Sequence, residues 1–126
     1  MTLNHIGLMN FNEADAHNFY GHILGFEEQY RFSLTPEESQ SIFSLPQELT
    51  VIVFSNGQLK LEIFIPQKSV TFNTGTTHVC LNVEHREMIV ERCRQKGLPV
   101  LTMQRNDRTA VFVKDFAGNI FELKES

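Results

Sequence analysis

Two histidines and two glutamates occupy corresponding places in the two halves of this 126-residue chain. His5 and His78 each open a run of alternating apolar residues, and Glu62 and Glu122 each lie inside another such run. Because side chains alternate between the two faces of a strand, each of the four points away from apolar neighbours that can pack against a helix. The four side chains are therefore expected on the concave faces of the sheets.

Two imidazoles and two carboxylates that face one hollow form a ligand set suited to a divalent metal ion. Without a cation, buried neighbouring carboxylates repel each other and lose their hydration, which is costly. Four nitrogen and oxygen ligands leave one or two coordination positions open for water or substrate oxygens, as catalysis requires. A single His or Glu of this kind is usually a surface residue, but four at matching places predict a metal site of His5, Glu62, His78 and Glu122.

The four residues follow an internal repeat. Residues 5–26 and 78–98 both open with His, a β-branched residue, a small residue and Leu, continue into a helical stretch, and close with Gly and an apolar residue. Three strands complete each half. The fold class predicted is α+β, with two βαβββ modules that form a curved, barrel-like mixed sheet around a cleft. The modules cover about 1–66 and 76–126 of a single domain.

The expected elements follow from periodicity and from helix and turn residues. Strands are predicted at 2–9, 26–32, 51–54, 59–65, 77–83, 99–103, 109–114 and 119–124, and helices at 12–24 and 86–96. Asn12 is the predicted N-cap of the first helix, with Asp15 able to reach back to it. Residues 35–49, bracketed by prolines, are predicted as a loop with one helical turn.

Composition limits the partners and the compartment. The net charge of −4 argues against a general nucleic-acid or anionic-membrane surface. No run approaches the ~20 apolar residues of a membrane helix, and the first residues do not resemble a signal peptide. Cys80 and Cys93 are too few for a disulfide scaffold and are interpreted as reduced thiols. The expectation is a cytoplasmic protein with no nucleic-acid or membrane partner.

Four further residues are candidates for contact with a substrate. Arg105 and Arg108 flank a predicted turn and could hold a carboxylate or phosphate group. Cys80 and Asn82 share the predicted face of His78. Asn82 could donate a hydrogen bond to substrate, and Cys80 is interpreted as a lining residue rather than a nucleophile.

Taken together, these segments resemble the vicinal oxygen chelate superfamily, which includes glyoxalase I, methylmalonyl-CoA epimerase, extradiol dioxygenases and antibiotic-resistance proteins. The resemblance covers nearly the whole chain and is carried by residues 3–8, 19–20, 24–26, 61–64, 77–79 and 115–123. The last segment is similar to the family's D-x-x-G-N-x-x-E-hydrophobic ending and is the most specific. The resemblance implies a small-molecule substrate and a homodimer, with a site inside one chain or shared between two.

In metal-using members similar to glyoxalase I, a His, Glu, His, Glu set binds nickel, zinc, cobalt or manganese, and these positions match His5, Glu62, His78 and Glu122. There, a carboxylate ligand can leave the metal and move a proton next to a carbonyl, while the metal chelates vicinal oxygens and stabilises an enediolate. The resemblance therefore implies a metal-dependent, glyoxalase-like lyase or isomerase. Glu122 and Glu62 are both candidates for the base.

Two departures bear on the substrate. Bacterial glyoxalase I has an Arg and an Asn that contact glutathione where this chain has Met9 and Pro66. Neither side chain can hold a carboxylate, which argues against a glutathione adduct. The alternatives are an acyl-CoA epimerase of the methylmalonyl-CoA type and a non-enzymatic resistance protein that binds a drug or metabolite.

Overall fold

The computed structural model describes residues 1–126, and these divide into two compact units, Met1–Phe72 and Asn73–Ser126. The strands are β1 (Ile6–Met9), β2 (Glu27–Leu34), β3 (Leu49–Ser55), β4 (Lys60–Pro66), β5 (His78–Val83), β6 (Val100–Arg105), β7 (Arg108–Lys114) and β8 (Ile120–Glu125). The helices are α1 (Glu13–Ala16), which continues as a π-helix over His17–Ile23, α2 (Pro36–Phe43) and α3 (Arg86–Gln95). No helix is both long and apolar enough to cross a membrane.

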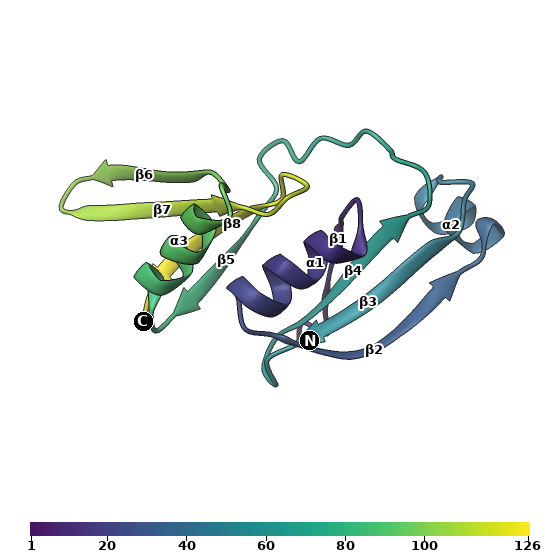
Figure 1. Ribbon diagram of the computed structural model, residues 1–126, viewed down its shortest axis with the longest axis horizontal. Helices are drawn as coiled ribbons and strands as arrows, with labels where there is room; N and C mark the ends of the chain where they lie inside the picture. The colour runs from purple at the N-terminus through teal and green to yellow at the C-terminus, as the bar shows by residue number, and fades with distance from the viewer. The chain divides into compact units, whose positions relative to one another are not determined.

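Each unit holds one four-stranded mixed sheet. The strand orders are β1-β4-β3-β2 and β5-β8-β7-β6, which are the same order repeated (Figure 1). In both sheets the first and last strands in sequence pair in parallel, and the remaining neighbours are antiparallel. The predicted α+β class and duplicated order are confirmed. The strands form two separate sheets, however, and not one closed barrel.

The parallel pairs set which residues are neighbours across the strands. Gly7 is the register partner of Glu62 in the first unit, and Cys80 is the partner of Glu122 in the second. Register partners lie on the same face of a sheet. The positions on β1 and β5 that share a face with the two histidines therefore also share a face with the two glutamates.

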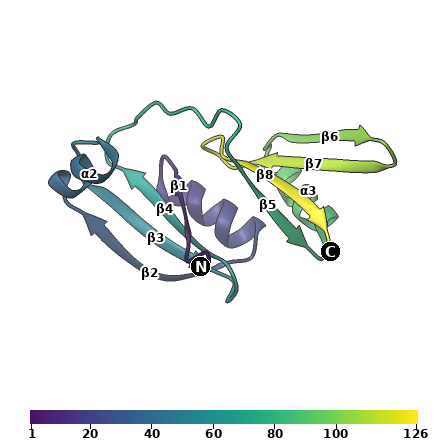
Figure 2. The ribbon, with the colours of Figure 1, turned by 180° about the vertical axis from the view of Figure 1, so that it is seen from behind.

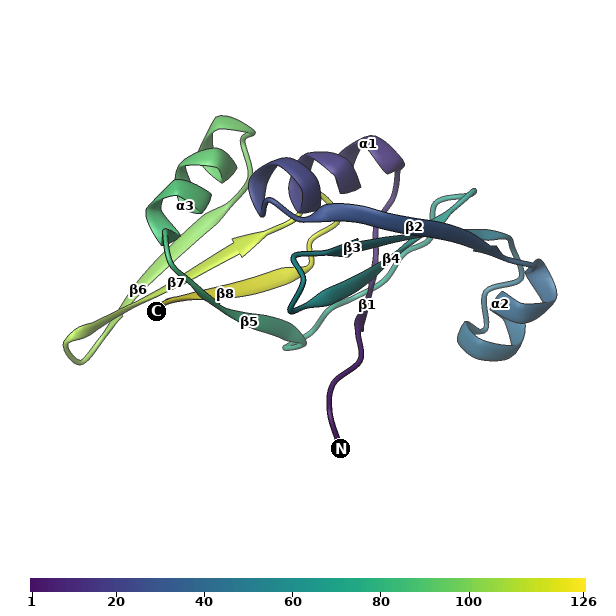
Figure 3. The ribbon, with the colours of Figure 1, turned by 90° about the horizontal axis from the view of Figure 1, so that it is seen from below.

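The opposite face of each sheet is buried beneath a helix (Figure 3). In the first unit Phe19, Tyr20 and Ile23 are fully buried, as are Leu61 and Ile63 of β4. In the second unit Cys93 of α3 is buried, as are Phe121 and Leu123 of β8. Removal of this apolar surface from water, at roughly 25 cal/mol per Å², stabilises each unit and leaves the other sheet face for the site.

The first helix begins as predicted but changes its winding. Asn12 accepts a hydrogen bond from the backbone N–H of Asp15 at 2.8 Å and so caps the N-terminus. After four α-helical residues, the chain widens into the π-helix, whose last turn is closed by Leu24 N donating to the carbonyl of Phe19. The expectation of a regular α-helix was therefore only partly right.

The helix α2 was predicted only as a loop with one turn. The Thr35 side chain accepts from the backbone N–H of Glu38, and the Glu38 carboxylate accepts from the backbone N–H of Thr35. With Pro36 in the first turn, this capping box stabilises an eight-residue helix. The helix ends at Ser44, which has a left-handed conformation, and lies at one end of the β2–β3 pair (Figure 2).

The turn before β8 is held by one buried carboxylate. The Asp115 carboxylate accepts hydrogen bonds from the backbone N–H groups of Ala117 and Asn119 and from the Asn119 side chain, at 2.8–3.0 Å. Gly118 supplies the positive φ of 91° that the turn requires. The Asp and Gly-Asn of the segment 115–123 therefore fix where β8, and with it Glu122, begins.

Replacing Asp115 by Ala is expected to destabilise the second unit by about 3 kcal/mol, because three buried or half-buried donors lose their acceptor. Urea unfolding followed by circular dichroism measures the change. The matched control is Asp107→Ala in the exposed β6–β7 turn, where a change within about 0.5 kcal/mol is expected. Equal stabilities of the two variants would contradict this role for Asp115.

Candidate metal centre

The first unit brings His5 and Glu62 together. His5 directly precedes β1 and Glu62 is central in β4, and His5 Nε2 lies 3.2 Å from Glu62 Oε1. Gly7 and Val53 are the register partners of Glu62 on either side, so its immediate neighbours are apolar. The parallel pairing of β1 with β4 therefore produces the contact that the alternation of residues predicted.

The second unit repeats this pair. His78 is the first residue of β5, Glu122 lies within β8, and His78 Nε2 is 3.7 Å from Glu122 Oε2. Here the register partners of Glu122 are Cys80 and Phe112. The two units thus place an imidazole and a carboxylate at equivalent points of equivalent sheets, in different surroundings.

Both rings present the same nitrogen to the carboxylate. Nδ1 of His78 lies 2.9 Å from the backbone carbonyl oxygen of Thr76, and Nδ1 of His5 lies 2.8 Å from Oδ1 of Asn4. A carbonyl oxygen only accepts, so a neutral ring with this contact donates its Nδ1 proton and directs the Nε2 lone pair toward the carboxylate. A histidine that binds a metal ion through Nε2 makes this kind of Nδ1 contact with an oxygen acceptor.

The donor set fits a divalent cation in type and spacing. Ligand bonds near 2.1 Å that meet at 90–110° separate the ligating atoms by roughly 3.0–3.4 Å. The Nε2–Oε1 separation of 3.2 Å in the first unit lies in this range, and the 3.7 Å in the second lies slightly beyond it. Each unit supplies two donors, and nowhere in the structure do three His, Cys, Asp or Glu side chains gather for a metal ion.

The four ligand candidates are less buried than expected. The side chains of Glu62 and Glu122 are 14% and 20% exposed, and those of His5 and His78 are about two-fifths exposed. Within a unit, the carboxylates therefore lie at the bottom of the open sheet face and the imidazoles at its rim. Water or a small molecule can reach both pairs from that face.

Cys80 lies beside Glu122, as its place on β5 predicted. Burial raises the pKa of the Cys80 thiol, and the negative charge of Glu122 raises it further, while Lys124 lowers it. A raised pKa keeps the sulfur protonated near neutral pH and makes it a poor nucleophile. This agrees with the interpretation of Cys80 as a lining residue.

Positively charged side chains border Glu122 on its other side. Arg105 and Arg108 are register partners in the β6–β7 hairpin, and together with Lys124 and Glu122 they line a hollow of about 530 Å³. Lys124 is also the register partner of Asn82. Lys124 is not among the residues predicted to contact a substrate, although its place two residues after Glu122 on the same strand puts it on the same face.

His17 of the first helix belongs to a separate cluster of charged side chains. His17 lies 3.6 Å from both Glu13 and Glu28, and Arg31 forms ion pairs with the same two carboxylates. The Arg31 guanidinium, chiefly through its hydrogen bond, lowers the pKa of Glu13. These contacts connect β2 with the start of the first helix and occupy the carboxylates, so this cluster is a structural one.

The family of the chain follows from its sequence together with this arrangement. The model of the Glyoxalase/Bleomycin resistance protein/Dioxygenase superfamily matches residues 4–113, and the chain belongs to that superfamily. This confirms the resemblance to vicinal oxygen chelate proteins. No curated protein matches the chain significantly.

Solved structures share the fold at low sequence identity. A glyoxalase family protein from Bacillus cereus superposes with a TM-score of 0.76 at 15% identity, over 98% of this chain and 92% of the other. One from Enterococcus faecalis gives 0.68 at 24%, over 97% and 95%. A mutant of the fosfomycin resistance protein FosX from Listeria monocytogenes, complexed with Mn(II) and 1S,2S-dihydroxypropylphosphonic acid, gives 0.72 at 21%, over 98% and 90%.

Alkylation by iodoacetamide tests the surroundings of Cys80. Only the thiolate reacts, so the raised pKa should shift the reaction to higher pH than that of a free cysteine. Glu122→Gln removes a negative charge, lowers the pKa and should speed alkylation at pH 8 by roughly threefold. Lys124→Gln should slow it.

Mass spectrometry of the labelled peptide separates Cys80 from Cys93. Cys93 is fully buried, and burial raises its pKa to about 11, so it should stay unlabelled in the folded protein. An unchanged or slower reaction in Glu122→Gln would show that the carboxylate does not act on the thiol.

Proposed function

We propose that the protein is a metal-dependent, glyoxalase-like lyase or isomerase in which His5, Glu62, His78 and Glu122 hold one divalent cation. The observation that carries this proposal is the repeated contact of an imidazole Nε2 with a carboxylate oxygen, with Nδ1 of each ring already engaged by an oxygen acceptor. Membership of the superfamily supports the same chemistry. Mn(II), which is bound in the FosX complexes, is the first ion to test.

The cation would act as a Lewis acid toward a substrate with two adjacent oxygens. The residues of the chain have three tasks around it. The imidazoles, oriented by Asn4 and Thr76, present neutral nitrogen donors. Glu62 or Glu122 takes a proton from the carbon next to a carbonyl and returns it to the neighbouring position. The half-open sheet face gives access to substrate.

The hollow lined by Arg105, Arg108 and Lys124 is suited to bind an anionic group of the substrate. Arg105, Arg108 and Lys124 lie on the same face as Glu122, so a carboxylate or phosphonate bound there stays next to the metal ligands. Asn82 and Cys80 line the β5 side of that face. A substrate with vicinal oxygens and an acidic group matches this surface better than a neutral one does.

Further parts of the proposal concern assembly and location. Each unit supplies half of the ligand set, so one cation needs both pairs, from one chain or from two chains of a homodimer. We place the protein in the cytoplasm, since both cysteines are free thiols.

Metal titration tests the ligand set. His5→Ala and Glu122→Gln should each weaken Mn²⁺ binding by about 10- to 100-fold or more, because each removes one of four donors. Isothermal titration calorimetry and elemental analysis measure the loss. Thermal unfolding of the metal-free proteins should be nearly unchanged, since both side chains lie at the open sheet face.

His17→Ala is the matched control, because His17 is comparably exposed and also contacts carboxylates. It should bind Mn²⁺ like the wild type. Metal content that stays the same in both site variants would refute this assignment. Exchange of a substrate α-proton for deuterium, with no consumption of O₂, would identify the isomerase type of chemistry.

The 1S,2S-dihydroxypropylphosphonic acid seen with FosX combines vicinal oxygens with an acidic group, and it serves as a probe of the cationic hollow. Arg105→Gln and Arg108→Gln should each weaken its binding to the Mn²⁺-loaded protein by about tenfold. Arg94→Gln, at an exposed position of α3, is the charge-matched control and should have no effect. Equal affinities of all three variants would exclude this surface as an anion site.

A further inference from the structure

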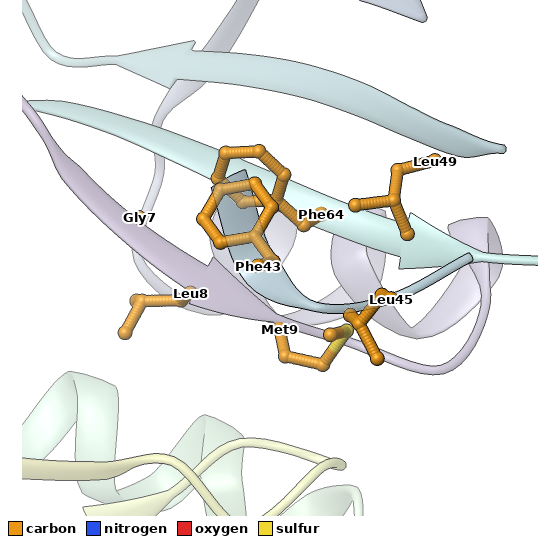
Figure 4. Close-up of a pocket in the computed structure, with 7 residues that line it drawn as sticks. All are labelled: Gly7, Leu8, Met9, Phe43, Leu45, Leu49 and Phe64. Carbon is orange, nitrogen blue, oxygen red and sulfur yellow. The ribbon is translucent and has the colours of Figure 1, made fainter. Parts of the chain in front are cut away.

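We propose that an apolar cavity beside Glu62 binds an uncharged aliphatic or aromatic substituent of the substrate, so that Phe43, Phe64 and Gly7 determine specificity. The cavity lies entirely within the first unit, between the C-terminal end of α2 and the sheet. It has a volume of about 250 Å³ and is lined by Gly7, Leu8, Met9, Phe43, Leu45, Leu49 and Phe64 (Figure 4). This inference rests on the proposed function, because it describes a ligand of the same site.

Two aromatic rings form one wall of the cavity. Phe43, the last residue of α2, meets Phe64 of β4 edge-on, with ring centroids 5.2 Å apart and an interplanar angle of 69°. Such edge-to-face pairs are favourable and hold both rings in place. Phe43 remains 43% exposed, so its ring also borders the entrance. In Figure 4, the two rings lie against each other and the Leu8 side chain points away from them.

Gly7 makes room for the Phe64 ring. A Cβ atom at this position would lie 3.0 Å from Cε2 of Phe64, closer than carbon atoms normally approach. The backbone of Gly7 does not have a positive φ, so the glycine is needed for space and not for conformation. The equivalent position of the second unit is Cys80, which shows that the strand itself accepts a side chain there.

The cavity continues directly from the proposed metal ligands. Gly7 is the register partner of Glu62, and Phe64 follows Glu62 on the same face of β4. A substrate with its oxygens at His5 and Glu62 therefore has its next substituent over Gly7 and Phe64. The lining offers no charged side chain, so a charged substituent would lose its hydration without compensation.

The volume limits the size of that substituent. Pockets for whole ligands span about 300–1,000 Å³, so about 250 Å³ suits a branched alkyl chain or one aromatic ring. Met9, which stands where bacterial glyoxalase I contacts glutathione, belongs to this lining. The lining of the first unit therefore favours an apolar substituent next to Glu62.

The first experiment uses metal-free protein and benzyl alcohol, a neutral aromatic probe that does not need the metal. With methyl-¹³C methionine, the Met9 resonance should shift saturably, while that of Met88, an exposed residue of α3, should not. Phe43→Ala should weaken the apparent affinity at least fivefold. Ile42→Ala is the matched control, since Ile42 lies on the same helix, is 62% exposed and does not line the cavity.

The second experiment uses hydroxamic acids, which chelate metal ions through two adjacent oxygens and carry a variable substituent. Benzohydroxamate should bind Mn²⁺-loaded protein at least about tenfold more tightly than acetohydroxamate. Gly7→Ala and Phe43→Ala should reduce this ratio toward one, and Ile42→Ala should leave it unchanged.

The outcomes separate this inference from the proposed function. An unshifted Met9 resonance, or equal behaviour of Phe43→Ala and Ile42→Ala, overturns the apolar subsite even if Mn²⁺ binds. A protein that fails to bind Mn²⁺ refutes the metal site, while the benzyl alcohol titration still decides on the subsite. Equal affinities of the Mn²⁺-loaded protein for the two hydroxamates also overturn the apolar subsite.

Discussion

The parallel pairing of the first and last strands in each unit is the constraint on which the site depends. In each unit it places two residues that are far apart in the sequence on the same face of the sheet. His5 therefore lies next to Glu62, and His78 lies next to Glu122. Hydrogen bonding at Nδ1 then turns the lone pair of each ring toward a carboxylate. Each unit therefore places one imidazole nitrogen and one carboxylate oxygen side by side, which is half of the proposed ligand set.

The two units keep this geometry but differ in what surrounds it. Glu62 lies among Gly7, Val53 and Phe64, whereas Glu122 has a thiol beside it and cationic side chains beyond. Glu62 and Glu122 therefore occupy equivalent positions in the strand register but have different neighbouring side chains. The second unit also has an apolar hollow, of about 440 Å³, beside His78 and Phe112, so the two units differ chiefly in the cationic side chains near Glu122. That difference is a physical basis for the proposed binding of an acidic substrate group near Glu122 rather than near Glu62.

Much of this arrangement could be predicted from the sequence, because alternation and repetition are local properties. Neighbouring residues were enough to predict which face of a strand each side chain occupies, which His and Glu residues are candidate metal ligands, and that Asn12 caps the first helix. The π-helix did not, since its winding depends on how the first helix packs on the sheet. The helix α2 was missed even though Thr35, Pro36 and Glu38 form its capping box, because two prolines were taken to indicate a loop. The apolar cavity depends on Phe43 meeting Phe64, a contact across 21 residues that periodicity alone cannot predict.

The position of α2 determines which part of the first unit can vary in sequence and length without disturbing the sheet. Leu34 and Leu49 are register partners and flank residues 35–48, which include α2. This segment therefore lies outside the hydrogen-bonded ladder of β2 and β3. Its length and composition can vary without shifting β3 or β4, since surface connections tolerate insertion. Of the residues proposed to determine specificity, Phe43 lies in this segment, whereas the proposed metal ligands His5 and Glu62 lie outside it. A different segment grafted between these two leucines would change the wall of the apolar cavity and leave the contact of His5 with Glu62 in place.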